Sequence, residues 1–192
     1  MEALKLQYYT YEEYTKWPEQ PRYELIDGTP YLMAAPNRIH AEITKNLFRC
    51  IDRYLRDKPC EPYFAPMDVR LFADAFTNGD TVVQPDVFVV CDKNKLDKKG
   101  VKGVPDFIIE ILSPGSGKMD KMIKFNKYEQ AGVPELWIVD PVHQIVTVYI
   151  LNKGKYARAV EYCHEDIILV NVISGLKIDL REIFPPQEDI EE

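Results

Sequence analysis

Long apolar runs are absent from this 192-residue chain, and no stretch approaches the roughly 20 apolar residues that cross a bilayer. The first six residues do not combine a basic region with an apolar core, so we expect no secretory signal and no membrane partner. The cysteines form no Cys-x-x-Cys pair, which argues against a zinc knuckle and a disulfide framework. We therefore expect reduced thiols and a cytoplasmic protein. The four cysteines are Cys50, Cys60, Cys91 and Cys163.

Several catalytic signatures are also missing. The chain has no His-Glu-x-x-His pair, no Gly-x-Ser-x-Gly elbow and no loop ending in Gly-Lys-Ser/Thr. Their absence argues against zinc proteases, serine hydrolases and P-loop enzymes. Residues 113–117 are rich in glycine and serine and precede a predicted helix, where an anion could bind, but this is weak support for a nucleotide site.

Positive charge is in short supply, with 24 Lys and Arg against 31 Asp and Glu and a net charge of −7. Four acids near the end, Glu188, Asp189, Glu191 and Glu192, contribute much of this excess. Such acidity is unfavourable for binding nucleic acid. Lysines nevertheless gather over residues 93–102, where a solvated loop is the simpler interpretation, and over residues 118–127 on a predicted helix.

No repeat or linker divides the chain, so we expect a single domain over 1–192, with a core from about 10 to 184 and an acidic tail over 186–192. Thr10 and Glu13 match a capping box ahead of a short helix. Asp27-Gly28 predicts a hairpin between strands over 23–28 and 29–33. Apolar spacing predicts a helix over 37–55. A second helix is expected over 118–131, where Gly132 ends it. Strands are expected near 69–72, 85–90, 135–140, 145–151 and 155–161, with a polar turn over 74–80 and a short element over 180–184. This order predicts an α/β fold with a central mixed sheet.

Glu110 is a charge in an apolar segment. It lies among Phe107, Ile108, Ile109, Ile111 and Leu112 in a run typical of a strand covered on both faces. A bare carboxylate there costs several kcal/mol unless a cation or a proton meets it. It could cap a neighbouring group or pair with a surface lysine, but the pattern favours a metal-binding or catalytic carboxylate.

Two further groups can reach Glu110. Asp86 opens the preceding strand, so both acids can lie at one edge of the sheet. Lys121, Lys124 and Tyr128 share one face of the helix that follows Glu110. Taken singly, Asp86 could be a turn residue, Lys124 a solvated lysine and Tyr128 a packing aromatic. Only their combination with Glu110 indicates a site.

Asp86, Glu110 and a backbone carbonyl, that of Ile111, would suit Mg²⁺ or Mn²⁺, because Mg²⁺ prefers oxygen ligands and keeps several waters. A lysine beside such an ion can orient a water and stabilise the charge that develops on a phosphate. The set Asp86, Glu110 and Lys124 could therefore hydrolyse phosphodiesters.

The order and spacing of several motifs resemble the Uma-type restriction endonuclease family, formerly a domain of unknown function, within the PD-(D/E)xK nuclease superfamily. The superfamily lysine usually stands two residues after the acid, where this chain has Leu112, but in some branches it lies on the following helix, as Lys124 would. The resemblance covers about residues 10–184. Its motifs are Tyr23-Glu-Leu-Ile-Asp-Gly28, His40, Gln84-Pro-Asp86, Glu110 with its flanking residues 104–114, Asp120, Lys124-Phe-Asn-Lys-Tyr128 and residues 132–141.

This resemblance implies a restriction-endonuclease-like fold, here with an N-terminal β-hairpin extension. It implies Asp86 and Glu110 as metal ligands and Lys124 as the catalytic lysine. Glu24 matches a further acidic position of the catalytic set, although by its sequence context it could equally be an exposed strand residue. His40 matches as a supporting residue, and otherwise it would cap the helix that it opens.

The leading hypothesis is a Mg²⁺-dependent endonuclease that cleaves DNA by attack of a metal-activated water, aided by Lys124. The alternative is a weak or inactive nuclease-fold module that binds nucleic acid or forms a dimer. A hydrolase of small phosphoesters is a third possibility. By analogy with nucleases that cut both strands, we expect a homodimer, with the apolar hairpin over 135–151 as a candidate interface.

Overall fold

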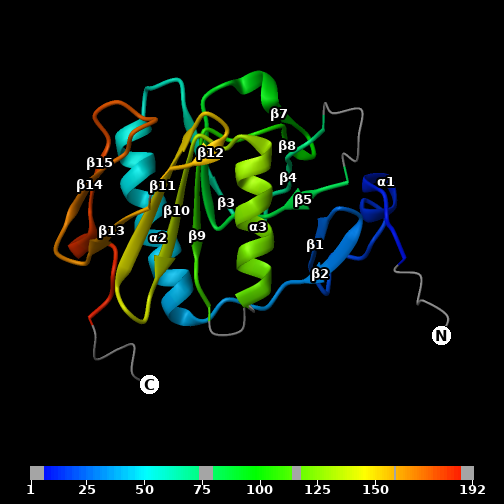
Figure 1. Ribbon diagram of the computed structural model, residues 1–192, viewed down its shortest axis with the longest axis horizontal. Helices are drawn as coiled ribbons and strands as arrows, with labels where there is room; N and C mark the ends of the chain where they lie inside the picture. The colour runs from blue at the N-terminus through cyan, green and yellow to red at the C-terminus, as the bar shows by residue number, and fades with distance from the viewer. Residues whose placement is uncertain (1–6, 74–79, 114–117, 158, 187–192) are drawn as a thin grey trace.

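The computed structural model describes residues 7–73, 80–113, 118–157 and 159–186, except for the side chains of 118–121 (Figure 1). The first helix of the described residues starts with the predicted capping box. Thr10 Oγ1 accepts from Glu13 N at 3.2 Å, and Glu13 Oε2 accepts from Thr10 N at 2.8 Å. These bonds start a single helical turn, α1 (Tyr11–Tyr14).

The predicted N-terminal hairpin is confirmed as β1 (Tyr23–Ile26) and β2 (Thr29–Leu32). Asp27 and Gly28 have φ of 49° and 72°, as a tight turn between twisted strands requires. The hairpin is built into a six-stranded sheet, because Leu25 pairs with Val82. The sheet order is β2-β1-β5-β4-β8-β7, with β4 (Val69–Arg70), β5 (Val82–Val83), β7 (Leu96–Asp97) and β8 (Gly100–Lys102).

The lysine-rich segment over 93–102 is not the loop expected from its composition. It holds a 3₁₀ turn, η1 (Lys93–Lys95), and then β7 and β8. Strands of two or three residues are too short to leave an alternating pattern, so the expectation of a loop rested only on the high lysine content of the segment.

The second sheet carries the predicted central strands, and it is mixed. Strands β9 (Phe107–Ile111) and β10 (Glu135–Asp140) run parallel, and helix α3 (Lys118–Ala131) connects them. The other pairings are antiparallel. The order is β12-β11-β10-β9-β6-β3, and β13 also pairs with β11. The remaining strands are β3 (Glu61–Phe64), β6 (Val87–Val90), β11 (Ile145–Asn152), β12 (Lys155–Tyr156) and β13 (Val160–Cys163).

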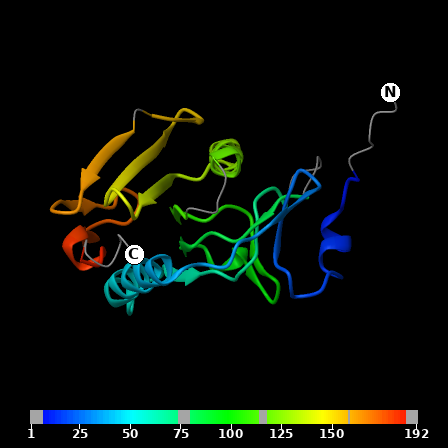
Figure 2. The same ribbon diagram turned by 90° about the horizontal axis from the view of Figure 1, so that it is seen from below.

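Helices cover both faces of this mixed sheet (Figure 2). Helix α2 (Arg38–Leu55) is capped by Asn37 and buries Ile43, Leu47 and Ile51 against one face. Helix α3 buries Tyr128 in the cluster on the other face. The predicted central mixed sheet flanked by helices is therefore confirmed.

The C-terminal third differs from the predicted pattern. The strand expected over 155–161 is divided into β12 and β13, and β14 (Ile167–Leu169) and β15 (Lys177–Asp179) were not predicted. The short element near 180 is a 3₁₀ turn, η2 (Leu180–Glu182).

The hairpin over 135–151 cannot serve as the suggested interface through β10, because Leu136, Trp137 and Val139 are fully buried. Most of the turn expected over 74–80, and the tail beyond Pro186, lie outside the described ranges.

The expectation of four unpaired thiols is wrong. Cys60 and Cys91 form a disulfide with an S–S distance of 2.07 Å. Cys60 directly precedes Glu61 and Cys91 directly follows Val90, and these two residues are the end pair of the antiparallel β3–β6 ladder, so strand pairing brings the cysteines together across 31 positions of sequence. Cys50 and Cys163 are free.

No helix in the described ranges is long and apolar enough to span a membrane.

Candidate functional site

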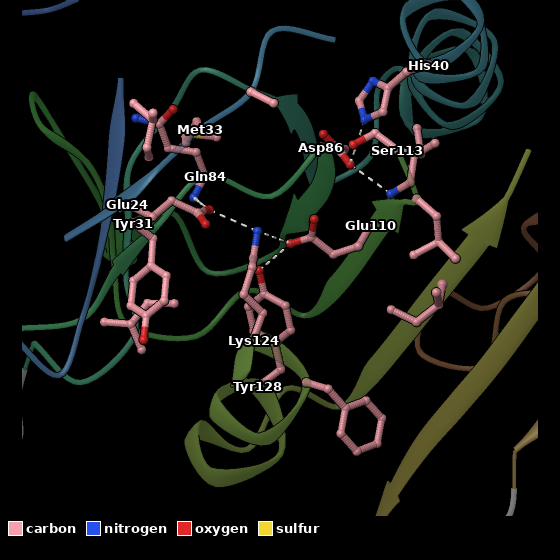
Figure 3. Close-up of a pocket in the computed structure, with 17 residues that line it drawn as sticks. Glu24, Tyr31, Met33, His40, Gln84, Asp86, Glu110, Ser113, Lys124 and Tyr128 are labelled. Carbon is pink, nitrogen blue, oxygen red and sulfur yellow. Dashed lines mark hydrogen bonds and ion pairs between the residues drawn. The ribbon is translucent and has the colours of Figure 1, made fainter. Parts of the chain in front are cut away.

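One pocket, with a volume of about 160 Å³, collects the predicted site residues whose side chains the structure describes (Figure 3). They come from five parts of the fold: the hairpin strand β1, the segment before β6, the central strand β9, and the helices α2 and α3. Lys121 lies on α3, but its side chain is outside the described part of the chain. The residues brought together are Glu24, His40, Asp86, Glu110, Ile111, Lys124 and Tyr128.

Lys124 is the centre of this arrangement. Its Nζ lies 2.7 Å from Glu110 Oε1 and 2.9 Å from Glu24 Oε1 (Figure 3). Tyr128 lies one turn further along α3, and its hydroxyl donates to the same Oε1 of Glu110. The predicted convergence of a strand carboxylate with a lysine and a tyrosine of the following helix is present in the structure.

Glu24 is buried, with 6% of the residue exposed. Besides Lys124, its Oε1 accepts a hydrogen bond from the backbone N–H of Gln84 at 2.7 Å. The alternative of an exposed strand residue is therefore wrong. Pairing of β1 with β5 turns Glu24 inward, and a sequence that shows only a short strand and an Asp-Gly turn does not reveal that pairing.

Asp86 links strand β9 to helix α2. Its Oδ2 accepts the backbone N–H of Ile111 at 2.7 Å and lies 3.1 Å from Nε2 of His40. The cap of α2 is Asn37, which accepts from the backbone N–H of His40 at 2.8 Å, so the His40 ring is left to contact Asp86. Burial lowers the pKa of His40, but the hydrogen bond and charge of Asp86 outweigh it and raise the pKa.

Burial also governs the ionisation of the central pair. It raises the pKa of Glu110 to about 7, although the neighbouring ammonium of Lys124 opposes the shift. Burial disfavours the charged form of Lys124, but the carboxylates of Glu110 and Glu24 outweigh it and raise the lysine pKa. Tyr128 has a pKa raised well above its ordinary value by burial and by Glu110, so its hydroxyl remains a donor.

The pocket suits a divalent cation in two respects. Three carboxylates, Glu24, Asp86 and Glu110, surround one lysine, which leaves an excess of formal negative charge. In addition, Oδ1 of Asp86 and Oε2 of Glu110 have no hydrogen bond or ion pair with any described residue. The donor set is nevertheless small, since no three Asp, Glu, His or Cys side chains in the described ranges are grouped to hold a metal. An ion here would keep mostly water ligands, as Mg²⁺ does.

Gln84 lines the same pocket and was not among the predicted site residues. Its side-chain Nε2 donates to Asp68 Oδ1 at 2.9 Å, and the Tyr14 hydroxyl donates to that oxygen at 3.1 Å. This network fixes the segment that carries the backbone N–H bonded to Glu24. Gln84 Oε1 is buried and has no partner among the described residues. The only sequence signal for Gln84 is its position two residues before Asp86.

Each of three comparisons with known proteins gives a match. The family described as "Uma2: Putative restriction endonuclease" matches residues 11–181. "Uncharacterized protein slr1290" of Synechocystis sp. is 29% identical over 121 residues, which are 61% of this chain and only 60% of that protein. The crystal structure of a putative nuclease belonging to DUF820 from Anabaena variabilis superposes with a TM-score of 0.74 at 21% identity, covering 91% of this chain and 97% of the other. The likeness to the solved structure supports the restriction-endonuclease-like fold.

Proposed function

The chain belongs to the Uma2 family of putative restriction endonucleases, and from this premise we propose that it is a metal-dependent endonuclease that hydrolyses phosphodiester bonds of DNA. The observation that carries the proposal is the position of Lys124. Its ammonium lies between the buried carboxylate of Glu24 and the partly buried carboxylate of Glu110, in a pocket that also contains Asp86. Simple stability does not explain three acids gathered in one small cavity, because each buried charge carries a desolvation penalty.

In this proposal Asp86 and Glu110 hold Mg²⁺ or Mn²⁺ through their free carboxylate oxygens, and the Ile111 carbonyl is a third donor. When bound, the ion would supply positive charge for the phosphate and lower the pKa of a coordinated water. The chain orients this set through the Ile111 N–H and His40, both of which contact the other oxygen of Asp86.

Lys124 is proposed as the catalytic lysine. Its ammonium donates hydrogen bonds, so it can position a water for attack and stabilise the charge that develops on the phosphate oxygens. Glu24 and Tyr128 fix it there: Glu24 accepts from Nζ, and Tyr128 occupies the Glu110 oxygen that Lys124 also contacts. Lys121 on the same helix is a further candidate for supporting this lysine.

The test is cleavage of DNA by the purified chain in Mg²⁺ or Mn²⁺. Asp86→Asn, Glu110→Gln and Lys124→Met are each expected to reduce the rate at least 100-fold, because loss of one stabilising group typically costs this much. Lys127→Met is the matched control, since Lys127 lies on α3 outside the pocket and pairs with Asp27. Cleavage that survives in both carboxylate variants would rule out this assignment.

A catalytically weak module that binds nucleic acid is the alternative. It is favoured by one observation, namely that Lys124 is already neutralised by two carboxylates. Calorimetry separates the two proposals. A nuclease is expected to bind Mn²⁺ in the wild type and to lose binding in Glu110→Gln. The inactive alternative predicts no binding and a more stable Glu110→Gln variant.

We also propose a homodimer. Support for the dimer is analogy with nucleases that pair two sites to cut both strands. Sedimentation equilibrium measures the mass directly, and a single species of 22.3 kDa would exclude the dimer.

A further inference from the structure

A larger groove adjoins the site pocket along helix α2. Its volume is about 540 Å³, and it shares His40, Asp86 and Ser113 with the pocket. From His40 the groove follows α2 to Arg49, a distance of about 13 Å at 1.5 Å per residue. A molecule that lies in the groove can therefore reach Asp86, one of the proposed metal-binding carboxylates.

The far part of the groove presents an aromatic ring. Phe64 lies on β3, the edge strand of the mixed sheet, and is 49% exposed. Phe48 of α2 supports it in an edge-to-face contact, with ring centroids 4.8 Å apart and an interplanar angle of 72°. The contact fixes Phe64 while half of its surface remains open to the groove.

Basic side chains border this ring. Lys45 and Arg49 are four residues apart on one exposed face of α2, and Arg22 approaches from the segment before β1. Arg49 has no hydrogen bond or ion pair with a described residue, and Lys45 has only a 3.9 Å contact with Glu42. Asp86, which His40 and Ile111 already engage, is the one acid among the described residues that line the groove. The groove is therefore locally cationic on a chain whose net charge is −7.

We propose that this groove binds an unpaired DNA strand, with one base stacked on Phe64 and the adjacent phosphates at Lys45 and Arg49. The inference rests on the proposed nuclease function, because the groove would deliver the strand to that site. An exposed ring next to cations is the combination that binds single strands. Bases inside a duplex stack on one another and offer no free face, so this surface favours unpaired or frayed DNA over a blunt duplex.

The test measures binding in EDTA, so that neither a metal ion nor cleavage contributes. Fluorescence anisotropy compares a short labelled DNA strand with the blunt duplex of the same sequence. The wild type is expected to bind the single strand more tightly. Phe64→Leu keeps an apolar side chain but removes the ring, and it should lower the affinity for the single strand about tenfold. Phe64→Trp should retain this affinity, and its tryptophan fluorescence should be quenched when the single strand binds.

The salt dependence of DNA binding tests the roles of Lys45 and Arg49. Lys45→Ala and Arg49→Ala should each reduce the slope of log affinity against log salt by about 0.7, the value for one phosphate contact on a single strand. Lys177→Ala is the control, because Lys177 is exposed on β15 and does not line the groove. Its slope should equal that of the wild type.

Three results would overturn the inference: equal affinity for single strand and duplex, unchanged affinity in Phe64→Leu, or a change of oligomeric state in Phe64→Leu without any DNA binding. The last would assign the groove to a second copy of the chain. Failure of the proposed nuclease function is a separate outcome. It would appear as Phe64-dependent binding in EDTA without cleavage in Mg²⁺ or Mn²⁺.

Discussion

Lys124 compensates two carboxylates that would otherwise be buried without a cation. We expect Lys124→Met to lower the free energy of unfolding at pH 8 by about 3–5 kcal/mol, as when one partner of a buried ion pair is removed. Burial already raises the pKa of Glu110 to about 7, and loss of the ammonium raises it further. The part of this penalty that comes from Glu110 applies above this pKa, where Glu110 is charged, and it shrinks as the pH falls and the carboxyl group takes up a proton.

Urea unfolding of Lys124→Met at pH 8 and pH 6 measures this effect. The difference from wild type should be smaller at pH 6, and adding Glu110→Gln to the variant should recover part of the stability at pH 8. Lys127→Met is the control at both values, because Asp27, its partner, is 53% exposed in its side chain. An equal loss of stability at pH 6 and pH 8 would contradict the argument.

Glu135 shows why a carboxylate in an apolar strand does not identify a site by itself. It is fully buried in β10, yet it lies outside the pocket. Its oxygens accept from Trp137 Nε1 at 2.8 Å and from the backbone N–H groups of Asn171 and Val172 at 2.8 and 2.9 Å. Each carboxylate oxygen of Glu135 accepts from donors of the protein, whereas Oε2 of Glu110 has no partner among the residues that the structure describes.

Glu135→Gln is therefore expected to act on stability alone. The amide replaces an accepting oxygen with a donor that faces other donors, which should cost about 1–3 kcal/mol. Thermal unfolding should show this loss, and calorimetry should show unchanged Mn²⁺ affinity. Glu110→Gln should give the opposite pair of results, with little loss of stability and no Mn²⁺ binding. A loss of metal affinity in Glu135→Gln would refute the distinction.

At the scale of elements, prediction succeeded where periodicity extends over several turns or residues. Helix α2 and strands β6, β9 and β10 lie where the apolar pattern placed them, and α3 ends at Ala131, where Gly132 was expected to stop it. Prediction failed for β3, β5, β7, β8, β14 and β15. All but β3 have only two or three residues, which are stabilised by their partners and leave no local pattern, and β3 contains Pro62, which argues against a strand. The same limit applies to the site. Asp86, Glu110 and Lys124 could be linked through a strand and its following helix, but the burial of Glu24 and the role of Gln84 depend on β1 pairing with β5 across 57 residues.

The Cys60–Cys91 disulfide joins β3 to β6, and β6 follows directly after Asp86. Closing a loop of 31 positions should stabilise the fold by about 3–4 kcal/mol through the lost entropy of the unfolded chain. Reductant or Cys91→Ser should lower the urea midpoint accordingly, while Cys163→Ser, at an exposed free cysteine, should not change it. Titration of the denatured, unreduced protein should find two thiols, and four thiols would contradict the pairing.

At the scale of the molecule, a net charge of −7 opposes the cationic groove. The acids of residues 187–192 contribute −4 of this total, so removing them leaves −3 and weakens the repulsion felt by an approaching DNA strand. We expect the truncated chain to associate with single-stranded DNA several-fold faster at low salt, as measured by stopped-flow anisotropy in EDTA. The Debye length shortens from about 30 Å at 0.01 M salt to about 8 Å at 0.15 M, so the gain should shrink as salt is added. A control in which the four acids are replaced by their amides keeps the chain length and should match the truncation. If that control binds like the wild type, length rather than charge is responsible, and the long-range electrostatic argument fails.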